Sequence, residues 1–279
     1  MMQPVSNLST IISRYDAVFM DLWGVVHDGS QLYPGVPEAL AKLREAKKKI
    51  IMISNAPRRA EKAVKVLAQL GVTPELYDYA VTSGEMGYRA LRTDTPWGRR
   101  YYYIGPSKDA DVLDGLEYQR VDDVKTADFL LNVGFGSEEE SSENWQMLLC
   151  AARGRALPML CLNPDFEVVK ITGERYACAG VLAADYEKMG GTVKYFGKPF
   201  PEIYEYCMEL LFPSPREREK KKILAIGDGI VTDIAGAVSF GIDAALVTGG
   251  IIKKDEHKVE GLCRKVNAVP NYVMPALVW

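Results

Sequence analysis

The sequence predicts an α/β fold in which a parallel-sheet domain is interrupted by a second, inserted α/β domain. Short apolar runs alternate with segments of helical periodicity, a pattern typical of parallel strands joined by helices. The pattern of the N-terminal part resumes in the C-terminal part, and the middle carries strands of its own. With 279 residues, the chain is long enough for two domains with well-buried cores.

The N-terminal part is predicted to contain two strand–helix pairs. Residues 17–23 form an apolar run that predicts a buried strand, and residues 36–49 have helical periodicity, with Pro37 suited to the first turn. A second strand is predicted over 50–55 and a second helix over 57–71. Strands that alternate with helices in this way are expected to lie parallel in one sheet.

The middle of the chain contains a second set of elements, after which the first pattern resumes. The middle elements are predicted strands over 101–105, 127–135 and 157–163 and a helix over 141–154. The later elements are predicted strands over 193–199, 222–229 and 244–250 and helices over 201–211 and 232–241. We therefore assign residues 1–84 and 191–279 to one discontinuous core domain and residues 85–190 to the insert, whose size is usual for a domain.

Composition and charge argue against several classes of function. Hydrophobic residues make up 48% of the chain and charged residues 25%, the balance of a globular protein. The formal net charge is −3 and the basic residues are dispersed, so neither a nucleic acid nor a membrane surface is expected as a partner. We find no secretory signal pattern, no apolar run near the roughly 20 residues of a membrane span, and five cysteines without metal-site spacing. We expect a cytoplasmic protein.

Four polar residues follow the apolar runs predicted for the core domain. Asp21 ends the first run, Ser54 follows the second, and Lys198 and Asp228 follow two of the later runs. Because open parallel sheets bind ligands at the carboxyl ends of their strands, these side chains are expected to share one site beneath the insert. Each residue taken singly is also typical of a turn or a helix cap, so the prediction depends on the set.

The four residue types suit phosphoryl transfer. A carboxylate can attack phosphorus as a nucleophile, and two carboxylates can hold Mg²⁺, which takes oxygen ligands. A hydroxyl, a backbone amide and a lysine can bind the phosphoryl oxygens on which charge accumulates. The sequence therefore favours a site for a phosphorylated ligand.

Motifs in a fixed order then indicate a family. They are "FMDLWGVVHDG" (19–29), "IIMISN" (50–55), "YFGKPFPEIY" (195–204) and "GDGIVTD" (227–233), with "LNPDFEVV" (162–169) and "CAGVLA" (178–183) in the insert. In these motifs the chain resembles the haloacid dehalogenase (HAD) superfamily, in its class IIA, NagD-like branch. The resemblance spans nearly the whole chain and implies a Rossmann-like parallel-sheet core with an inserted α/β cap.

The resemblance also implies roles for individual residues. The implied assignments are Asp21 as nucleophile and metal ligand, Ser54 and Lys198 as catalytic residues that also bind the phosphate, Asn55 as a further phosphate-binding residue, Asp228 as a metal ligand and Asp233 as an acid that supports the metal shell. The cap loop offers Asn163, Asp165 and Glu167 for contacts with the substrate. The implied activity is Mg²⁺-dependent hydrolysis of a small phosphorylated metabolite, a sugar phosphate or nucleotide-like molecule, through an aspartyl-phosphate. A homodimer formed through the cap is also implied.

One position departs from the pattern of the family. Most phosphatases of this superfamily carry an aspartate two residues after the nucleophile, which protonates the leaving oxygen and then activates water. Here the position is Trp23, whose indole offers an N–H donor that does not titrate usefully. Its backbone carbonyl could still be the metal ligand that the family takes from this position. Loss of a general acid–base group typically costs about 10²–10⁴ in rate.

Several consequences of Trp23 stay open at this point. His27 or Asp28 could supply the proton from the turn that follows. Hydrolysis could instead be slow and restricted to good leaving groups, or the protein could be a regulatory module that binds a phosphometabolite without turnover. A dehalogenase is the least favoured alternative, because "GDGIVTD" implies a metal that dehalogenation does not require.

Overall fold

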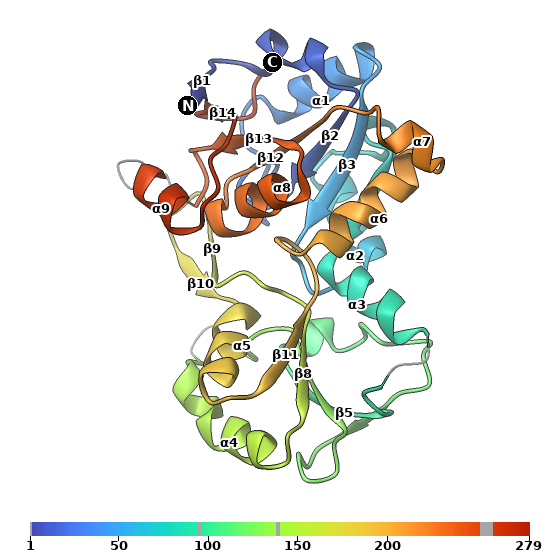
Figure 1. Ribbon diagram of the computed structural model, residues 1–279, viewed down its shortest axis with the longest axis vertical. Helices are drawn as coiled ribbons and strands as arrows, with labels where there is room; N and C mark the ends of the chain where they lie inside the picture. The colour runs from blue at the N-terminus through green and yellow to red at the C-terminus, as the bar shows by residue number, and fades with distance from the viewer. Residues whose placement is uncertain (1, 94–95, 138–139, 252–258) are drawn as a thin grey trace.

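The computed structural model shows two α/β domains, the core and the cap, stacked along the long axis of the molecule (Figure 1). The structure describes residues 2–93, 96–137, 140–251 and 259–279. Both N- and C-terminal ends of the chain lie in the core, at the far end from the cap (Figure 1). The predicted fold class, a Rossmann-like parallel sheet with an inserted α/β cap, is confirmed.

The core is built on a parallel sheet of seven strands. In spatial order these are β1 (Gln3–Pro4), β14 (Tyr272–Met274), β13 (Asp243–Val247), β12 (Ile223–Gly227), β2 (Ala17–Asp21), β3 (Lys49–Ser54) and β4 (Tyr79–Thr82). Strands β2 and β12 are buried along their whole length, as expected for central strands covered on both faces. This burial explains their uninterrupted apolar runs.

Helices cover both faces of the core sheet. On one face, α1 (Val36–Glu45) and α2 (Ala60–Gln69) pack against alternate residues of β2, among them Met20. On the other face, α6 (Pro201–Leu211) and α8 (Ala235–Phe240) pack around Phe19, whose ring lies 6.5 Å from that of Tyr204. The described part of the core also contains α7 (Pro215–Arg218) and α9 (Val259–Lys265), while α3 (Ser83–Leu91) follows β4 and buries Leu91 among side chains of the cap. The period of two along β2 thus divides its side chains between two hydrophobic cores.

The cap contains a parallel sheet of five strands and a separate hairpin. In spatial order the strands are β11 (Thr192–Tyr195), β8 (Pro158–Cys161), β7 (Phe129–Asn132), β5 (Arg100–Ile104) and β6 (Gln119–Val121). Helices α4 (Gln146–Gly154) and α5 (Ala179–Lys188) pack on one face. The antiparallel hairpin of β9 (Glu167–Val169) and β10 (Arg175–Ala177) lies between the two domains (Figure 1).

The strand predicted over 193–199 belongs to the cap sheet, whereas the sequence assignment placed it in the core. Strand β11 pairs with β8 in parallel, with Thr192 opposite Pro158, and α5 is the helix between them. A strand, a crossover helix and a parallel neighbouring strand form one βαβ unit, so β11 follows its partner into the cap sheet. The chain therefore returns to the core after Tyr195, and not at residue 191.

None of the helices within the described ranges is long and apolar enough to cross a lipid bilayer.

Candidate active site

A cavity of about 90 Å³ lies between the carboxyl ends of the core strands and the loop and hairpin of the cap. The core contributes Asp21, Trp23, Ser54, Asn55, Ala56, Lys198, Asp228, Gly229, Thr232, Asp233 and Ile251, and the cap contributes Asn163, Asp165, Glu167, Val168 and Val169. Strands β12, β2 and β3 are adjacent in the sheet, and Asp228, Asp21 and Ser54 stand at or next to their ends. The sheet topology thus brings together residues that are far apart in the sequence.

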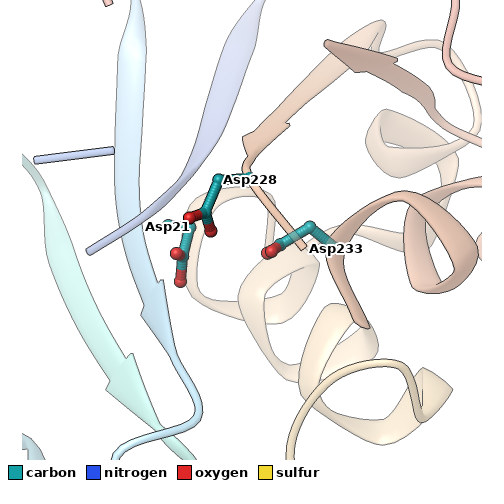
Figure 2. A group of neighbouring side chains, drawn as sticks. All are labelled: Asp21, Asp228 and Asp233. Atoms are coloured by element: carbon teal, nitrogen blue, oxygen red, sulfur yellow. The ribbon is translucent and has the colours of Figure 1, made fainter. Parts of the chain in front are cut away.

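Three carboxylates form the centre of the site (Figure 2). Asp21 ends β2, Asp228 directly follows β12, and Asp233 lies on the π-helical turn Ile230–Ile234 that leads into α8. The three residues are 5–6% exposed, and one oxygen from each side chain lies within 4.8 Å of the others. Like charges this close and this well buried are unfavourable unless a cation lies among them.

Lys198 supplies one positive charge. Its Nζ donates to Asp21 Oδ1 and, at 2.6 Å, to Asp233 Oδ1. Burial lowers the pKa of this lysine, but the neighbouring Asp21 and Asp233 outweigh burial and hold the pKa well above its usual value. Lys198 therefore stays charged. It reaches the site from the connection that follows β11, and not from the end of a core strand as the sequence assignment assumed.

One ammonium does not balance this cluster. Burial, reinforced by neighbouring carboxylates, raises the pKa of Asp21 well above its usual range. Burial and the nearby Asp233 raise the pKa of Asp228 from its ordinary value of 3.8 to about 7. Both directions mean that Lys198 alone does not offset the cost of ionising these buried carboxylates. The cluster accordingly has the negative charge that a divalent cation would neutralise.

The residues fit a divalent cation of the Mg²⁺ type. The donors are carboxylate oxygens, the ligands that such cations prefer. The backbone also leaves room around Asp228, because a Cβ atom on Gly24 or Gly250 would overlap its carboxylate. Asp233 already accepts from Lys198 and, at 3.0 Å, from the Gly229 N–H, which leaves Asp21 and Asp228 as the freer ligands. The backbone carbonyl of Trp23 stays a predicted ligand.

Ser54 and Asn55 line the cavity at the end of β3, but they differ in the hydrogen-bond donors that they have left for a ligand. The Ser54 Oγ accepts the Ala56 N–H at 3.2 Å and keeps its hydroxyl proton as a donor. The Asn55 side chain accepts the Lys198 N–H at 2.7 Å and donates to the Lys198 carbonyl and to Asp165 Oδ1. Both amide hydrogens of Asn55 are therefore used within the protein, so its side chain positions Lys198 and Asp165 and has no donor left for a phosphate.

The turn after Asp21 is hydrogen-bonded to the cap hairpin at two points. Trp23 lines the cavity, and its Nε1–H donates to the Val169 carbonyl of β9 at 2.9 Å. Asp28 Oδ2 accepts the Ile171 N–H at 3.2 Å, and Asp28 Oδ1 accepts from the backbone and hydroxyl of Ser30. The residue that replaces the expected acid therefore holds the cap against the core.

The structure does not support His27 or Asp28 as the proton donor. Neither belongs to the set of residues that lines the cavity. His27 Nδ1 accepts the Gly29 N–H at 2.9 Å, and burial lowers the pKa of this histidine to about 4, so it is neutral at pH 7. Burial alone would raise the pKa of Asp28, but the hydrogen bonds from Ser30 outweigh it and lower that pKa. Both residues instead stabilise the turn by accepting hydrogen bonds within it.

The three predicted residues of the cap loop all reach the cavity. Asn163 Oδ1 accepts the Asp165 N–H at 3.1 Å and so shapes the loop. Glu167 forms an ion pair with Arg175 across the hairpin. Burial raises the pKa of Asp165 to about 6, although Lys198 and Asn55 act in the opposite direction. Asp165 is thus a partly buried carboxyl that lines the same cavity as Asp21 and Lys198.

Among the cavity residues that sequence reasoning did not single out, Thr232 and Ile251 are the informative ones. Thr232 lines the cavity, and the Ile251 N–H donates to Asp228 Oδ2 at 2.6 Å. Thr232 lies inside the "GDGIVTD" motif, where only the two aspartates were singled out. Ile251 follows a Gly-Gly pair just beyond β13. Two glycines after a strand of this sheet indicate that the backbone there comes close to a neighbouring group, so the sequence did contain a signal for this contact.

The fold and the site together define a capped α/β enzyme whose centre is built from carboxylates and a lysine. A family model described as haloacid dehalogenase-like hydrolase matches residues 18–119, and a HAD-hydrolase-like model matches residues 195–277. The crystal structure of a haloacid dehalogenase-like hydrolase from Brucella suis is 32% identical with a TM-score of 0.84, over 98% of this chain and 100% of that chain. The chain belongs to the haloacid dehalogenase-like hydrolase family, as its motifs indicated.

Two curated relatives place the chain near phosphatases of the NagD type. The sugar-phosphatase AraL of Bacillus subtilis is 24% identical over 93% of this chain and 90% of its own length. The ribonucleotide monophosphatase NagD of Escherichia coli is 26% identical over 86% of this chain and 90% of its own length. The predicted resemblance to the class IIA, NagD-like branch is confirmed by these relatives and by the NagD structure, which has a TM-score of 0.66.

We predict that Trp23→Phe loosens the hairpin from the core. The variant keeps the ring but removes the Nε1–H donor to Val169, a bond worth about 0.5–1.5 kcal/mol. Amide hydrogen exchange of residues 164–178 should become several-fold faster. Trp145→Phe is the matched control, because the Trp145 indole donates to Glu140 within the cap. Equal exchange of the hairpin in Trp23→Phe and the unsubstituted protein would show that this bond does not dock the cap.

Proposed function

We propose that this protein is a Mg²⁺-dependent phosphomonoesterase that hydrolyses a small phosphorylated metabolite, a sugar phosphate or nucleotide-like molecule, through an aspartyl-phosphate. The observation that carries the proposal is the buried cluster of three carboxylates around Lys198, placed beneath a cap at the carboxyl ends of the core strands. The relatives AraL and NagD, named as phosphatases of sugars and ribonucleotides, support the same activity.

Asp21 is the proposed nucleophile. Its carboxylate oxygen forms a bond to phosphorus while the bond from phosphorus to the leaving oxygen breaks, and water then releases inorganic phosphate and restores the carboxylate. The Lys198 ammonium, bound to Asp21, would orient this carboxylate and stabilise charge on the phosphoryl oxygens. The Ser54 hydroxyl would donate to another phosphoryl oxygen. A cation held by Asp21 and Asp228 would supply the remaining positive charge.

The cap must open to admit a metabolite. The cavity of about 90 Å³ is far smaller than the roughly 300–1,000 Å³ of typical ligand pockets, so it accommodates a phosphoryl group but not a large leaving group. Closure over the bound substrate would exclude water from the reacting atoms. The hydrogen bonds from Trp23 and Asn55 to the cap would re-form on closure. Identical hydrogen exchange of residues 163–169 with and without Mg²⁺ and inorganic phosphate would contradict such movement.

A binding module without turnover is the second candidate, and Trp23 is the observation that favours it. The position of the family's acid–base aspartate is occupied by an indole that is committed to the cap. A phosphate-release assay over a metabolite panel, with and without Mg²⁺, separates the two functions. Thermal stabilisation by a metabolite without any phosphate release would favour the binding module.

We predict that Asp21→Asn abolishes phosphate release. The amide is nearly the same size as the carboxylate but lacks the nucleophilic charge, so kcat should fall by about 10⁴-fold or more. The measurement is inorganic phosphate produced from p-nitrophenyl phosphate with Mg²⁺ present. Asp114→Asn is the control, because Asp114 is exposed in the cap and lies outside the cavity. Turnover that survives in Asp21→Asn would refute the assignment of the nucleophile.

We predict that Mg²⁺ stabilises the protein more at pH 8 than at pH 5. The pKa of Asp228 is raised to about 7 in the cation-free protein, so the folded state binds a proton more tightly than the unfolded chain. Stability of the cation-free protein should therefore fall as the pH rises from about 4 to about 7. Saturating Mg²⁺ should remove much of this loss, whereas Asp228→Asn should weaken both the pH dependence and the shift in Tm. Equal Mg²⁺-induced Tm shifts at both pH values would argue against a cation at Asp228.

A further inference from the structure

We propose that Asp165 of the cap loop takes the place of the missing acid–base residue. In this assignment its carboxyl protonates the leaving oxygen in the first step and removes a proton from the attacking water in the second. The inference rests on the proposed phosphatase function and names the residue that completes it. The position two residues after the nucleophile, occupied by Trp23, then has no acid–base role.

The geometry of in-line attack points to the cap. The attacking and leaving oxygens lie roughly opposite each other across phosphorus. Because Asp21 attacks from the core side, the leaving oxygen faces the cap wall of the cavity, which consists of Asn163, Asp165, Glu167, Val168 and Val169. Within the described residues, this wall offers two titratable groups, Asp165 and Glu167. Glu167 is held in an ion pair with Arg175 across the hairpin, whereas Asp165 faces the site.

Asp165 is positioned by the same amide that positions the catalytic lysine. The Asn55 Nδ2 donates to Asp165 Oδ1 at 2.8 Å, while Asn55 Oδ1 accepts the Lys198 N–H at 2.7 Å. On the cap side, Asn163 Oδ1 accepts the Asp165 N–H at 3.1 Å. These contacts fix the carboxyl at the boundary between the domains, and among the described residues its Oδ2 has no hydrogen-bond partner, which leaves this oxygen to exchange a proton.

The surroundings of Asp165 suit a group that must hold a proton in one step and release it in the next. Burial raises its pKa to about 6, Asp233 acts in the same direction, and Lys198 and Asn55 oppose them. Close to it are the buried thiols of Cys161 and Cys178, whose pKa burial raises to about 12, so they carry no charge at neutral pH. A pKa near the working pH is what an efficient general acid–base residue needs. Neither Trp23 nor the turn residues His27 and Asp28 meet this condition.

Both chemical steps balance with Asp165 as the only proton carrier. In the first, the Asp21 carboxylate binds phosphorus, the phosphorus–oxygen bond to the leaving group breaks, and the Asp165 proton passes to that oxygen. The products are an alcohol, the aspartyl-phosphate and an ionised Asp165. In the second, the Asp165 carboxylate takes a proton from water as the water oxygen binds phosphorus. Inorganic phosphate leaves, the Asp21 carboxylate is restored, and Asp165 is protonated again.

The test compares Asp165→Asn with the unsubstituted protein on two aryl phosphates of similar size. The asparagine keeps an oxygen that can accept from Asn55 but cannot exchange a proton. Phenyl phosphate has a basic leaving group that needs protonation, whereas p-nitrophenyl phosphate has one that leaves as the anion. We expect kcat/KM for phenyl phosphate to fall by about 10²–10⁴-fold, the usual contribution of a general acid, and kcat/KM for p-nitrophenyl phosphate to fall far less. The decline of kcat/KM for phenyl phosphate above pH about 6 should also disappear.

A matched variant and the unsubstituted protein separate the possible outcomes. Glu167→Gln removes the other carboxyl of the cap wall and should change both substrates by the same factor. If Asp165→Asn also lowers both substrates equally, the residue acts only in cap structure and the inference is wrong. If the unsubstituted protein already hydrolyses phenyl phosphate 10²–10⁴-fold more slowly than p-nitrophenyl phosphate and Asp165→Asn does not change this ratio, catalysis is unassisted and the inference is again wrong. If the unsubstituted protein hydrolyses neither ester with Mg²⁺ and releases no phosphate from any member of the metabolite panel, the proposed function itself fails.

Discussion

The ion pair of one buried lysine with two buried aspartates determines the rest of the site. Lys198 is 2% exposed and contacts Asp21 and Asp233, so removal of the ammonium would leave uncompensated carboxylates in a largely buried place. Such an arrangement is costly to build, and it is retained only where its parts are held rigidly. The adjacent strands β2 and β12 hold Asp21 and the start of the turn that carries Asp233. The lysine itself comes from the connection between cap and core.

Because Lys198 lies in the connection from the cap to the core, the position of its ammonium depends on the position of the cap. The lysine follows β11, the last strand of the cap sheet, and its backbone is fixed by Asn55 at the end of core strand β3. Asn55 also holds Asp165 of the cap loop. Movement of the cap therefore disturbs the hydrogen bonds that orient both the cationic and the acidic partner of the phosphoryl group. Each neutral hydrogen bond of this kind is worth about 0.5–1.5 kcal/mol, which permits opening on the timescale of turnover.

The sequence allowed the core of the fold to be predicted because its central strands are buried on both faces and read as uninterrupted apolar runs. The meeting of Asp21, Ser54 and Asp228 followed from the rule that strand ends share one edge of a sheet. The strand at 192–195 could not be assigned to a sheet in this way, because an apolar run does not reveal its neighbour. Local sequence also could not show which polar side chains of the turn and the cap face the cavity.

If Asp165 is the acid–base residue, the presence of Trp23 in place of the family's aspartate means that this role has moved from the core to the cap. An acid on the core turn would be present in the open and the closed enzyme alike, whereas Asp165, which contacts the core through Asn55, would in the proposed mechanism reach the phosphoryl group only when the cap is docked. Trp23 in turn contributes to that docking through Val169. A substrate whose body prevents closure would then meet a nucleophile without a proton donor. Selectivity would arise in the chemical step and not only in binding, which is how induced fit discriminates between substrates that bind equally well.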